Sequence, residues 1–560
     1  MPVKPSYALP RQVADRYVDA LIQLDPITGT HLGVKESSGL LPDFSPAGRE
    51  TVAELARETL ASLDDAEKRP GGDSDAERRC GRLLRERLTA ELAVHDADEG
   101  LRTVSNIHSP VHAVREVFAV TPTSTDEDWA AVAQRLRAVP AALEGYRASL
   151  ALGLERKLLG GPRATRTHIE QLTDWLGTDR SWFEDFAADG PDALRAELDE
   201  AARSATEALA ALRDWMREVY APAVADAPDT VGRERYARWS RYFNGTDFDL
   251  NEAYAYGWSE YHRLLAEMKT EAHKILPGAG PWEALAHLDV HGEHIEGVEE
   301  VRVWLQNLMD EAIGALDGTH FELAERVRKV ESRIAPPGGA AAPYYTGPSE
   351  DFTRPGRTWL PTMGETRFPV YDLVSTWYHE GVPGHHLQIA QWVHVADQLS
   401  RYQATVGIVS ANAEGWALYA ERLMDELGFL PDPERRLGYL DAQMMRSTRV
   451  IVDIGMHLEL EIPADSPFHP GERWTPALAQ EFFGRHSGRP ADFVESELTR
   501  YLSMPAQAIG YKLGERAWLL GRENARKAHG DAFDPKAWHM AALSQGSLGL
   551  DDLVDELSKL

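Results

Sequence analysis

Three histidines and one glutamate fall within eight residues of this 560-residue chain, in the stretch Trp377-Tyr378-His379-Glu380-Gly381-Val382-Pro383-Gly384-His385-His386-Leu387-Gln388. Imidazole nitrogens and carboxylate oxygens are ligands of Zn²⁺. In helical zinc hydrolases, a glutamate directly after the first histidine deprotonates a metal-bound water. The stretch therefore predicts a metal site with His379 as a ligand and Glu380 as the general base.

The spacing of the histidines differs from the common His-Glu-x-x-His pattern, in which the second ligand lies four residues after the first. That position is Pro383, which cannot donate to the carbonyl of His379, and the glycines on either side favour a bulged or interrupted helix. On an ideal helix His386 returns to within about 20° of the face of His379, whereas His385 lies about 120° away. Periodicity favours His386, but a bulge that absorbs two residues would deliver His385, so both are candidate ligands.

A third ligand is expected from the stretch Asn412-Ala413-Glu414-Gly415-Trp416-Ala417-Leu418-Tyr419-Ala420-Glu421, which has the composition of a helix. Glu414 and Glu421 are seven residues apart and share a face with apolar neighbours, so both carboxylates are expected to point inward. A buried carboxylate needs a cation or hydrogen-bond donors. We expect Glu414 to be the third ligand and Glu421 to support a histidine. The alternative is that both lie at a helix surface.

The sequence resembles the DUF885 family in these two stretches and in three others. The further motifs are Leu24-Asp25-Pro26 through Thr30-His31-Leu32-Gly33, Arg449-Val450-Ile451-Val452-Asp453-Ile454-Gly455-Met456-His457, and Pro505-Ala506-Gln507-Ala508-Ile509-Gly510-Tyr511-Lys512-Leu513-Gly514. The resemblance implies a mainly helical, zincin-like fold related to the gluzincin peptidases, in which two histidines and a glutamate hold Zn²⁺. The family is poorly assigned as to substrate.

Two of these motifs offer groups for the transition state. Arg446, Arg449, Asp453 and His457 form a polar stripe along one helix face, which must be internally paired if it is buried. One interpretation is a structural helix held by salt bridges. In the other, which the resemblance favours, His457 oriented by Asp453, or one of the arginines, contacts the substrate oxyanion or its carboxylate.

Tyr511 is the first candidate for a hydroxyl that donates to the oxyanion, because zinc hydrolases need such a donor in addition to the metal. The glycine before it permits a close approach of the backbone. The alternative is a core tyrosine whose hydroxyl bonds to a helix end.

The composition limits the partners of the chain. Its 59 basic and 89 acidic residues give a net charge of −30, which opposes binding to nucleic acid or to an anionic membrane. Cys80 is the only cysteine, so an intramolecular disulfide and a thiolate zinc site are excluded. Residues 1–24 lack the apolar core of a secretory signal, and no apolar run reaches the roughly 18 residues of a membrane span. We expect a cytoplasmic protein; the sequence indicates no oligomeric state.

The predicted fold class is mainly α: a large helical fold with a small β-sheet next to the metal-binding helix. A proline at Pro46 and a capping box from Ser74 to Glu77 mark two helix starts. Turn signals between Arg326 and Pro361, including Pro336-Pro337-Gly338-Gly339, indicate short strands or a proline-rich linker. We expect residues 1–330 to form a helical wall of the cleft and residues 331–560 the metal-binding region, joined as one continuous fold unit. Long helices are predicted at 74–94, 126–150, 193–220, 251–275 and 298–316.

The predicted function is a zinc-dependent hydrolase of a small peptide or amide, acting through a metal-activated water with Glu380 as the base. Two alternatives use the same scaffold: a metal-dependent enzyme of specialised metabolism with a small non-peptide substrate, and a catalytically silent peptide-binding relative. The presence of Glu380 argues against the silent relative. The sequence does not indicate whether cleavage would be terminal or internal.

Overall fold

The computed structural model describes residues 8–336 and 342–560, which divide into two compact units. Residues up to Asp229 form the first unit together with Ser400–Tyr402, and Thr230–Leu399 with Gln403–Leu560 form the second. The predicted division after residue 330 does not coincide with this boundary, because the described part of the proline-rich segment forms strands within the second unit. Residues 337–341 of that segment lie outside the described residues.

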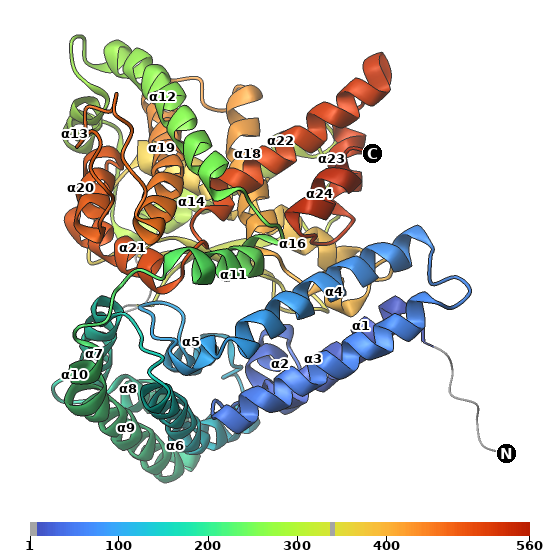
Figure 1. Ribbon diagram of the computed structural model, residues 1–560, viewed down its shortest axis with the longest axis vertical. Coiled ribbons are helices and arrows are strands. Elements are labelled where there is room, and N and C mark those ends of the chain that lie inside the picture. The colour runs from blue at the N-terminus through green and yellow to red at the C-terminus, as the bar shows by residue number, and fades with distance from the viewer. Residues whose placement is uncertain (1–7, 337–341) are drawn as a thin grey trace. The chain divides into compact units, whose positions relative to one another are not determined.

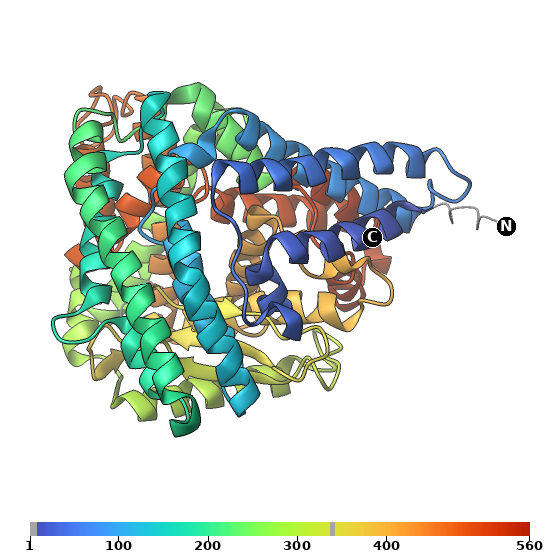
Figure 2. The ribbon, with the colours of Figure 1, turned by 90° about the horizontal axis from the view of Figure 1, so that it is seen from below.

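The first unit is helical. Its α-helices are α1 (Pro10–Leu24), α2 (Pro26–Leu32), α3 (Pro46–Glu67), α4 (Asp75–Asp96), α5 (Pro110–Val120), α6 (Asp126–Glu155), α7 (Pro162–Leu176), α8 (Trp182–Ala188), α9 (Arg195–Trp215) and α10 (Ala221–Val224). The core lies between α6 and α9, which run side by side in Figure 2. Ser45 caps α3 as its Ser-Pro start predicts, whereas the side chain of Ser74 makes no capping bond and Glu77 instead accepts from Arg11.

The second unit is also mainly helical. Its α-helices are α11 (Gly232–Asn244), α12 (Leu250–Ile275), α13 (Pro281–His291), α14 (Val298–Leu316), α15 (Val370–Glu380), α16 (His385–His394), α17 (Arg401–Ala404, which begins in the first unit), α18 (Ser410–Glu426), α19 (Pro433–Leu458), α20 (Pro476–His486), α21 (Ala491–Ser503), α22 (Gly510–His529), α23 (Pro535–Leu543) and α24 (Leu550–Leu557). Two helix pairs, α12 with α19 and α18 with α22, make its most extensive contacts (Figure 1). The predicted mainly helical fold is confirmed.

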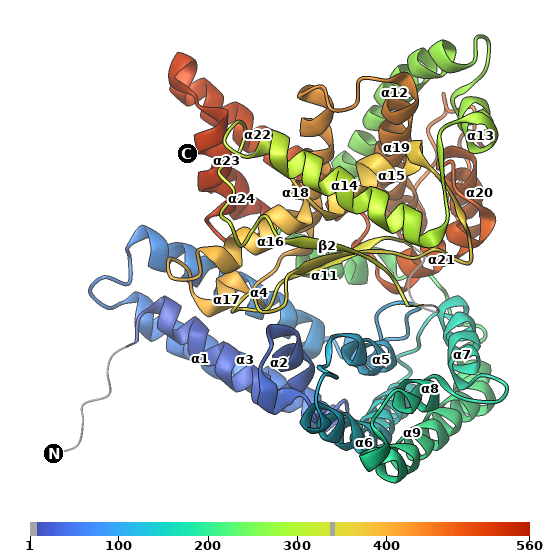
Figure 3. The ribbon, with the colours of Figure 1, turned by 180° about the vertical axis from the view of Figure 1, so that it is seen from behind.

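Two small sheets accompany these helices. Strands β2 (Val330–Ile334), β4 (Gly356–Leu360) and β3 (Tyr344–Thr346) form one sheet in the order β2-β4-β3, with β2 parallel and β3 antiparallel to β4. Strands β1 (His294–Glu296) and β5 (Arg367–Pro369) form the other. Figure 3 shows β2 beside α14, and β4 contacts α16. The indole of Trp377 on α15 donates to Ser332 at 3.1 Å, so the three-stranded sheet lies next to the helix that carries His379.

No helix among the described residues is long and apolar enough to cross a membrane.

Candidate metal centre

The break between α15 and α16 sets the positions of the histidines. Helix α15 ends at Glu380 and α16 begins at His385, with a short connection between them. A Cβ atom at Gly384 would lie 2.0 Å from the carbonyl oxygen of His379, so only glycine allows the chain to fold back this closely. The indole of Trp416 donates to the carbonyls of Pro383 and Gly384 at 2.9 and 3.1 Å, which fixes the connection to α18.

Helix α18 brings Glu414 to the two histidines. The Nε2 atoms of His379 and His385 lie 3.3 and 3.4 Å from the same oxygen, Oε2 of Glu414. One ligand atom from each of the three residues lies within 4.8 Å of the other two. Two ligand atoms about 2.0–2.1 Å from one tetrahedral Zn²⁺ are about 3.3 Å apart. The measured separations therefore fit a shared ion.

A direct ion pair explains the same distances less well. A charge-assisted N–H···O bond is usually about 2.7–2.9 Å long, and the buried Oε2 of Glu414 makes no hydrogen bond with any residue that the structure describes. Burial alone would raise the pKa of Glu414, but His379 and His385 hold it well below its usual range. The carboxylate is thus ionised at neutral pH and available as a ligand.

Glu421 orients His379 from the side away from Glu414. Its Oε1 atom lies 2.8 Å from Nδ1 of His379, and its Oε2 atom accepts from the hydroxyl of Ser375 at 2.7 Å. Glu421 is fully buried and ionised, because Arg446 and these donors outweigh the effect of burial and lower its pKa. Burial would lower the pKa of His379, but the carboxylates of Glu414 and Glu421 on its two sides raise it. A proton on Nδ1 donates to Glu421, which leaves Nε2 on the side of the other ligands.

Glu380 is buried next to the ligands, with 6% of its surface exposed. In the absence of a cation, burial, opposed by His385 and assisted by the charge of Glu414, raises the pKa of this carboxyl to about 8. The group can therefore hold or release a proton near neutral pH, which general acid–base work requires.

Tyr511 and Arg449 adjoin the same histidine. The ring of Tyr511 stacks parallel to that of His379, with ring centroids 6.2 Å apart, and the guanidinium of Arg449 lies 4.6 Å from the centroid of the tyrosine ring. Arg449 is held in place by Tyr501 at 2.8 Å and Glu497 at 2.7 Å. Burial and the charge of Glu414 raise the pKa of Tyr511, so its hydroxyl stays protonated and able to donate.

Arg446 approaches the metal centre through Glu421. One of its terminal nitrogens lies 3.6 Å from Oε1 of Glu421, and the other donates to the carbonyl of Ala442 at 3.1 Å. Within residues 8–336 and 342–560, its buried Nε has no hydrogen-bond partner. The arginine therefore supports the carboxylate that orients His379.

His386 is separated from the metal centre by its own hydrogen bonds. Its Nε2 donates to the carbonyl of Val327 at 2.6 Å, and the hydroxyl of Tyr345 donates to its Nδ1 at 3.0 Å. Burial lowers the pKa of His386 to about 4, so the ring is neutral. Of the two candidates for the second ligand, the structure groups His385 with His379 and Glu414.

His457 and Asp453 also have other partners. Nδ1 of His457 accepts from the backbone N–H that precedes α11 at 3.2 Å, and its Nε2 donates to the carbonyl of Tyr501 at 3.1 Å. Asp453 accepts from the hydroxyl of Tyr236 at 2.6 Å and the backbone N–H of Ala506 at 2.9 Å. Neither ring nitrogen of His457 is free to meet a substrate. We assign both residues a structural role, which corresponds to the alternative interpretation of this stripe.

Several residues of the site were missed at the level of sequence. Trp416 and Gly415 belong to the motif that supplied Glu414, but the motif does not indicate that the indole would hold the histidine connection. A Cβ atom at Gly415 would lie 2.3 Å from the carbonyl carbon of Gly514, so these two glycines let α18 and α22 touch. In the sequence, a glycine follows Glu414 and another lies three residues after Tyr511. These two glycines are the pattern that could have indicated the contact.

Two solved structures resemble the chain over nearly its full length. One is described as a "putative lipoprotein" from Colwellia psychrerythraea; it is 19% identical, the alignment covers 98% of each chain, and the TM-score is 0.83. The other is described as a "putative lipoprotein of unknown function" from Shewanella oneidensis, with 18% identity, 98% and 100% coverage and a TM-score of 0.71. At these identities the likeness shows the fold alone. No curated protein matches the chain.

The family described as "Bacterial protein of unknown function (DUF885)" matches residues 26–557. This range includes the histidine motif, the helix with Glu414 and the motif with Tyr511. The resemblance inferred from the separate motifs is confirmed, and the chain belongs to the DUF885 family.

Proposed function

We propose that this protein is a zinc-dependent hydrolase of peptide or amide bonds, with a zincin-like site related to that of the gluzincins. The observation that carries the proposal is the convergence of ligand atoms from His379, His385 and Glu414 within 4.8 Å, next to the buried carboxyl of Glu380. Three protein ligands are typical of catalytic zinc sites, whereas structural sites usually have four.

Zn²⁺ would be held by His379, His385 and Glu414. When bound, the ion supplies a Lewis acid that lowers the pKa of a water toward about 7 and polarises a carbonyl. The donor set fits this ion because it contains two imidazoles and one carboxylate, with each Nε2 at 3.3 or 3.4 Å from the carboxylate oxygen.

Glu380 would take a proton from the attacking water and return it to the leaving amine. Its low exposure excludes bulk water from this proton. A bound cation would favour the ionised form of this carboxyl, which is the form that accepts the proton. The hydroxyl of Tyr511 would donate to the oxyanion of the tetrahedral intermediate, and Arg449 on the face of its ring stabilises the tyrosine in that position.

A short peptide is the substrate class that the surroundings favour. Strand β3 is an edge strand of the three-stranded sheet, and its Tyr345 bonds to His386, the neighbour of His385. An extended peptide can add to such an edge through backbone hydrogen bonds, which would bring its carbonyl groups near the ligands.

The test is the variant Glu380→Gln, compared with Glu365→Gln, which changes an exposed glutamate of the same unit. Zinc content is measured by elemental analysis and hydrolysis with a panel of short peptides and amides. We expect Glu380→Gln to retain stoichiometric zinc but to lose hydrolysis by at least a hundredfold, and Glu365→Gln to match the wild type. Undiminished hydrolysis by Glu380→Gln would refute the base. Zinc without cleavage in the wild type would favour an enzyme of small non-peptide substrates, and absence of zinc a binding protein.

A further inference from the structure

A buried lysine, Lys512, is connected to the candidate metal centre by hydrogen bonds. Lys512 follows Tyr511 on α22 and is 1% exposed. Its Nζ donates to Gln443 at 2.7 Å and to Glu515 at 2.6 Å, and it lies 3.4 Å from Oε2 of Glu260. An ammonium group has three protons and no acceptor. Every proton of Lys512 thus has an acceptor, which a buried cation requires.

Gln443 connects Lys512 to Glu421, the carboxylate that orients His379. It lies on α19 and is 1% exposed; its Oε1 accepts from Lys512, and its Nε2 donates to Oε2 of Glu421 at 3.4 Å. An ammonium can only donate and an ionised carboxylate can only accept. Only one of the two orientations of the amide satisfies both neighbours, so Lys512 determines which way Gln443 points.

The same directionality continues to the histidine. Oε2 of Glu421 is occupied by donors from Gln443 and Ser375, and Oε1 faces Nδ1 of His379 at 2.8 Å. A carboxylate fixed in this way can accept the Nδ1 proton of the imidazole but cannot donate to it. Four side chains in sequence, from Lys512 to His379, therefore hold the ring of His379 in one orientation.

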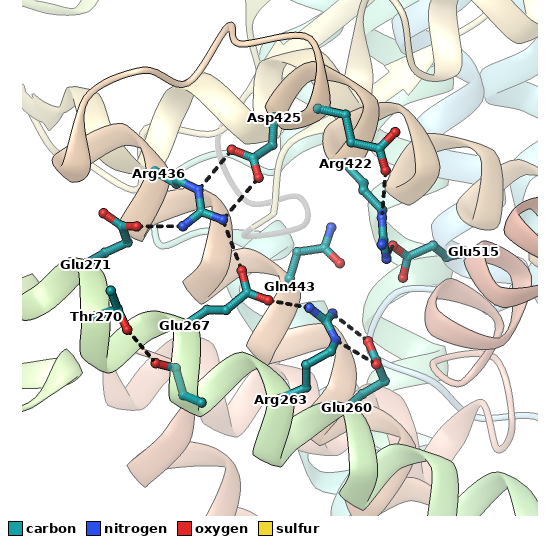
Figure 4. A network of polar contacts seen from close by, with 12 residues as sticks. Glu260, Arg263, Glu267, Thr270, Glu271, Arg422, Asp425, Arg436, Gln443 and Glu515 are labelled. Carbon is teal, nitrogen blue, oxygen red and sulfur yellow. Dashed lines mark hydrogen bonds and ion pairs between the residues drawn. The ribbon is translucent and has the colours of Figure 1, made fainter. Parts of the chain in front are cut away.

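Ion pairs on the outer side of Lys512 keep one of its acceptors, Glu260, charged. Figure 4 shows Glu260 paired with both Nε and a terminal nitrogen of Arg263, at 2.9 and 2.8 Å, and Arg263 paired with Glu267, which also accepts from Arg436. Burial would raise the pKa of Glu260, but Arg263 and Lys512 hold it at about 2. The series of ion pairs thus extends from Arg263, whose side chain is 41% exposed, to the buried lysine.

We propose that Lys512 is a positioning residue of the metal centre: by donating to Gln443 it orients Glu421, which holds the ring of His379 through Nδ1 and directs its Nε2 toward the ion. The effect on metal affinity rests on the function proposed above. The effect on the orientation of the ring does not, because it concerns the metal-free protein.

Two variants break this chain of hydrogen bonds between side chains at different points. Lys512→Met alone would leave the buried Glu515 with only the more distant Arg422, at 3.9 Å, as a cationic partner. The double variant Lys512→Met/Glu515→Met therefore removes both charges together. Gln443→Met breaks the chain at an uncharged residue of similar size. Glu515→Gln is the matched control, since it removes a charge beside Lys512 but keeps an acceptor for it and leaves the bond to Gln443 intact. Circular dichroism and thermal unfolding identify the folded variants.

The first readout is the crystal structure of the metal-free protein and of each folded variant, in which the ring of His379 is located relative to Glu421. We expect Nδ1 of His379 to lie within hydrogen-bond distance of Oε1 of Glu421 in the wild type and in Glu515→Gln, and this contact to be lost in the two chain-breaking variants. An unchanged ring in both of those variants would overturn the role of Lys512. Loss of the contact in Glu515→Gln would also overturn it, because the charge beside Lys512 rather than its bond to Gln443 would then control the ring.

The second readout is the affinity for Zn²⁺, measured by competition with a chromophoric chelator. Loss of an outer partner of a ligating histidine typically weakens metal binding by about 10- to 100-fold. We expect a weakening of about tenfold in both chain-breaking variants and none in Glu515→Gln; unchanged affinity in all three would contradict the proposal. If the wild type binds no Zn²⁺, the proposed function fails, and the orientation of the His379 ring alone decides the role of Lys512.

Discussion

His385 and His386 are adjacent residues with different surroundings. The Nε2 atoms of His385 and His379 lie close to the same oxygen, Oε2 of Glu414, and the side chain of His385 is 12% exposed. His386 is fully buried, and both of its ring nitrogens bond to neighbours in the protein. The two residues can therefore be distinguished by parallel substitutions.

His385→Gln is expected to lower zinc affinity by at least about tenfold with little change in stability, because it removes a ligand at the open side of the site. His386→Gln should retain zinc but lose about 1–3 kcal/mol of unfolding free energy, because it disturbs buried hydrogen bonds. Elemental analysis and urea unfolding of the two variants measure these effects. The opposite pattern, with zinc lost only in His386→Gln, would mean that the second ligand is misassigned.

Asp453 should make stability depend on pH. Burial raises its pKa to about 7 from the ordinary 3.8, so between these values the folded protein holds a proton that the unfolded chain has lost. Stability from this group is present below pH 4 and is lost as the pH rises through 7. Asp453→Asn remains neutral, so its stability relative to the wild type should increase from pH 5 to pH 8 by on the order of 1–3 kcal/mol. Urea unfolding across this range measures the difference; parallel pH profiles would contradict the prediction.

Among the helices, the contact between α18 and α22 brings the two functional motifs together. Gly415 follows Glu414, and Gly514 lies one turn after Tyr511 on the partner helix. A Cβ atom at Gly514 would lie 2.1 Å from the carbonyl oxygen of Ala411. The distance between the two helix axes, and with it the distance between the ligand and the tyrosine, depends on both residues lacking side chains.

Gly415→Ala and Gly514→Ala are each expected to separate these helices, costing about 1–3 kcal/mol of stability and weakening both zinc binding and hydrolysis. Gly314→Ala on α14 is the matched control, because no atom lies within 4 Å of the added Cβ and alanine favours a helix interior by up to about 1 kcal/mol. Thermal unfolding and zinc titration measure the effects. If the three variants behave alike, close contact between α18 and α22 does not control the site.

Sequence patterns predicted elements more reliably than their partners. The runs 251–275 and 298–316 correspond closely to α12 and α14, since apolar periodicity reports a local property. Periodicity favoured His386 over His385, because it treats the stretch as one regular helix. The number of residues that a helix break takes up does not follow from any local rule. The capping box at Ser74 failed because Glu77 pairs with Arg11, 66 residues away. The contacts of His457 and Gln443 are likewise made with residues far away in sequence. Helical spacing predicts which residues share a helix face but does not predict which residues pack against that face.

At the scale of the whole molecule, the candidate centre belongs to the second unit alone. Its ligands and their supporting residues come from α15, α16, α18, α19 and α22. These elements are separated by up to about 130 residues in sequence, so an ion held among them would link distant parts of one unit. The first unit has its own hydrophobic core between α6 and α9.

Zinc should therefore stabilise the two units unequally. An ion that binds only the folded state at a free concentration 1,000 times its Kd stabilises that state by about 4 kcal/mol. Hydrogen exchange with and without zinc, after removal of metal with a chelator, should show slower exchange in α15, α16 and α18 and unchanged exchange in α6 and α9, because opening of the ligand helices must release the ion. His379→Gln should abolish the difference. Equal slowing throughout both units would mean that the ion acts elsewhere or that the units open only together, and no slowing in α18 would remove Glu414 from the ligand set.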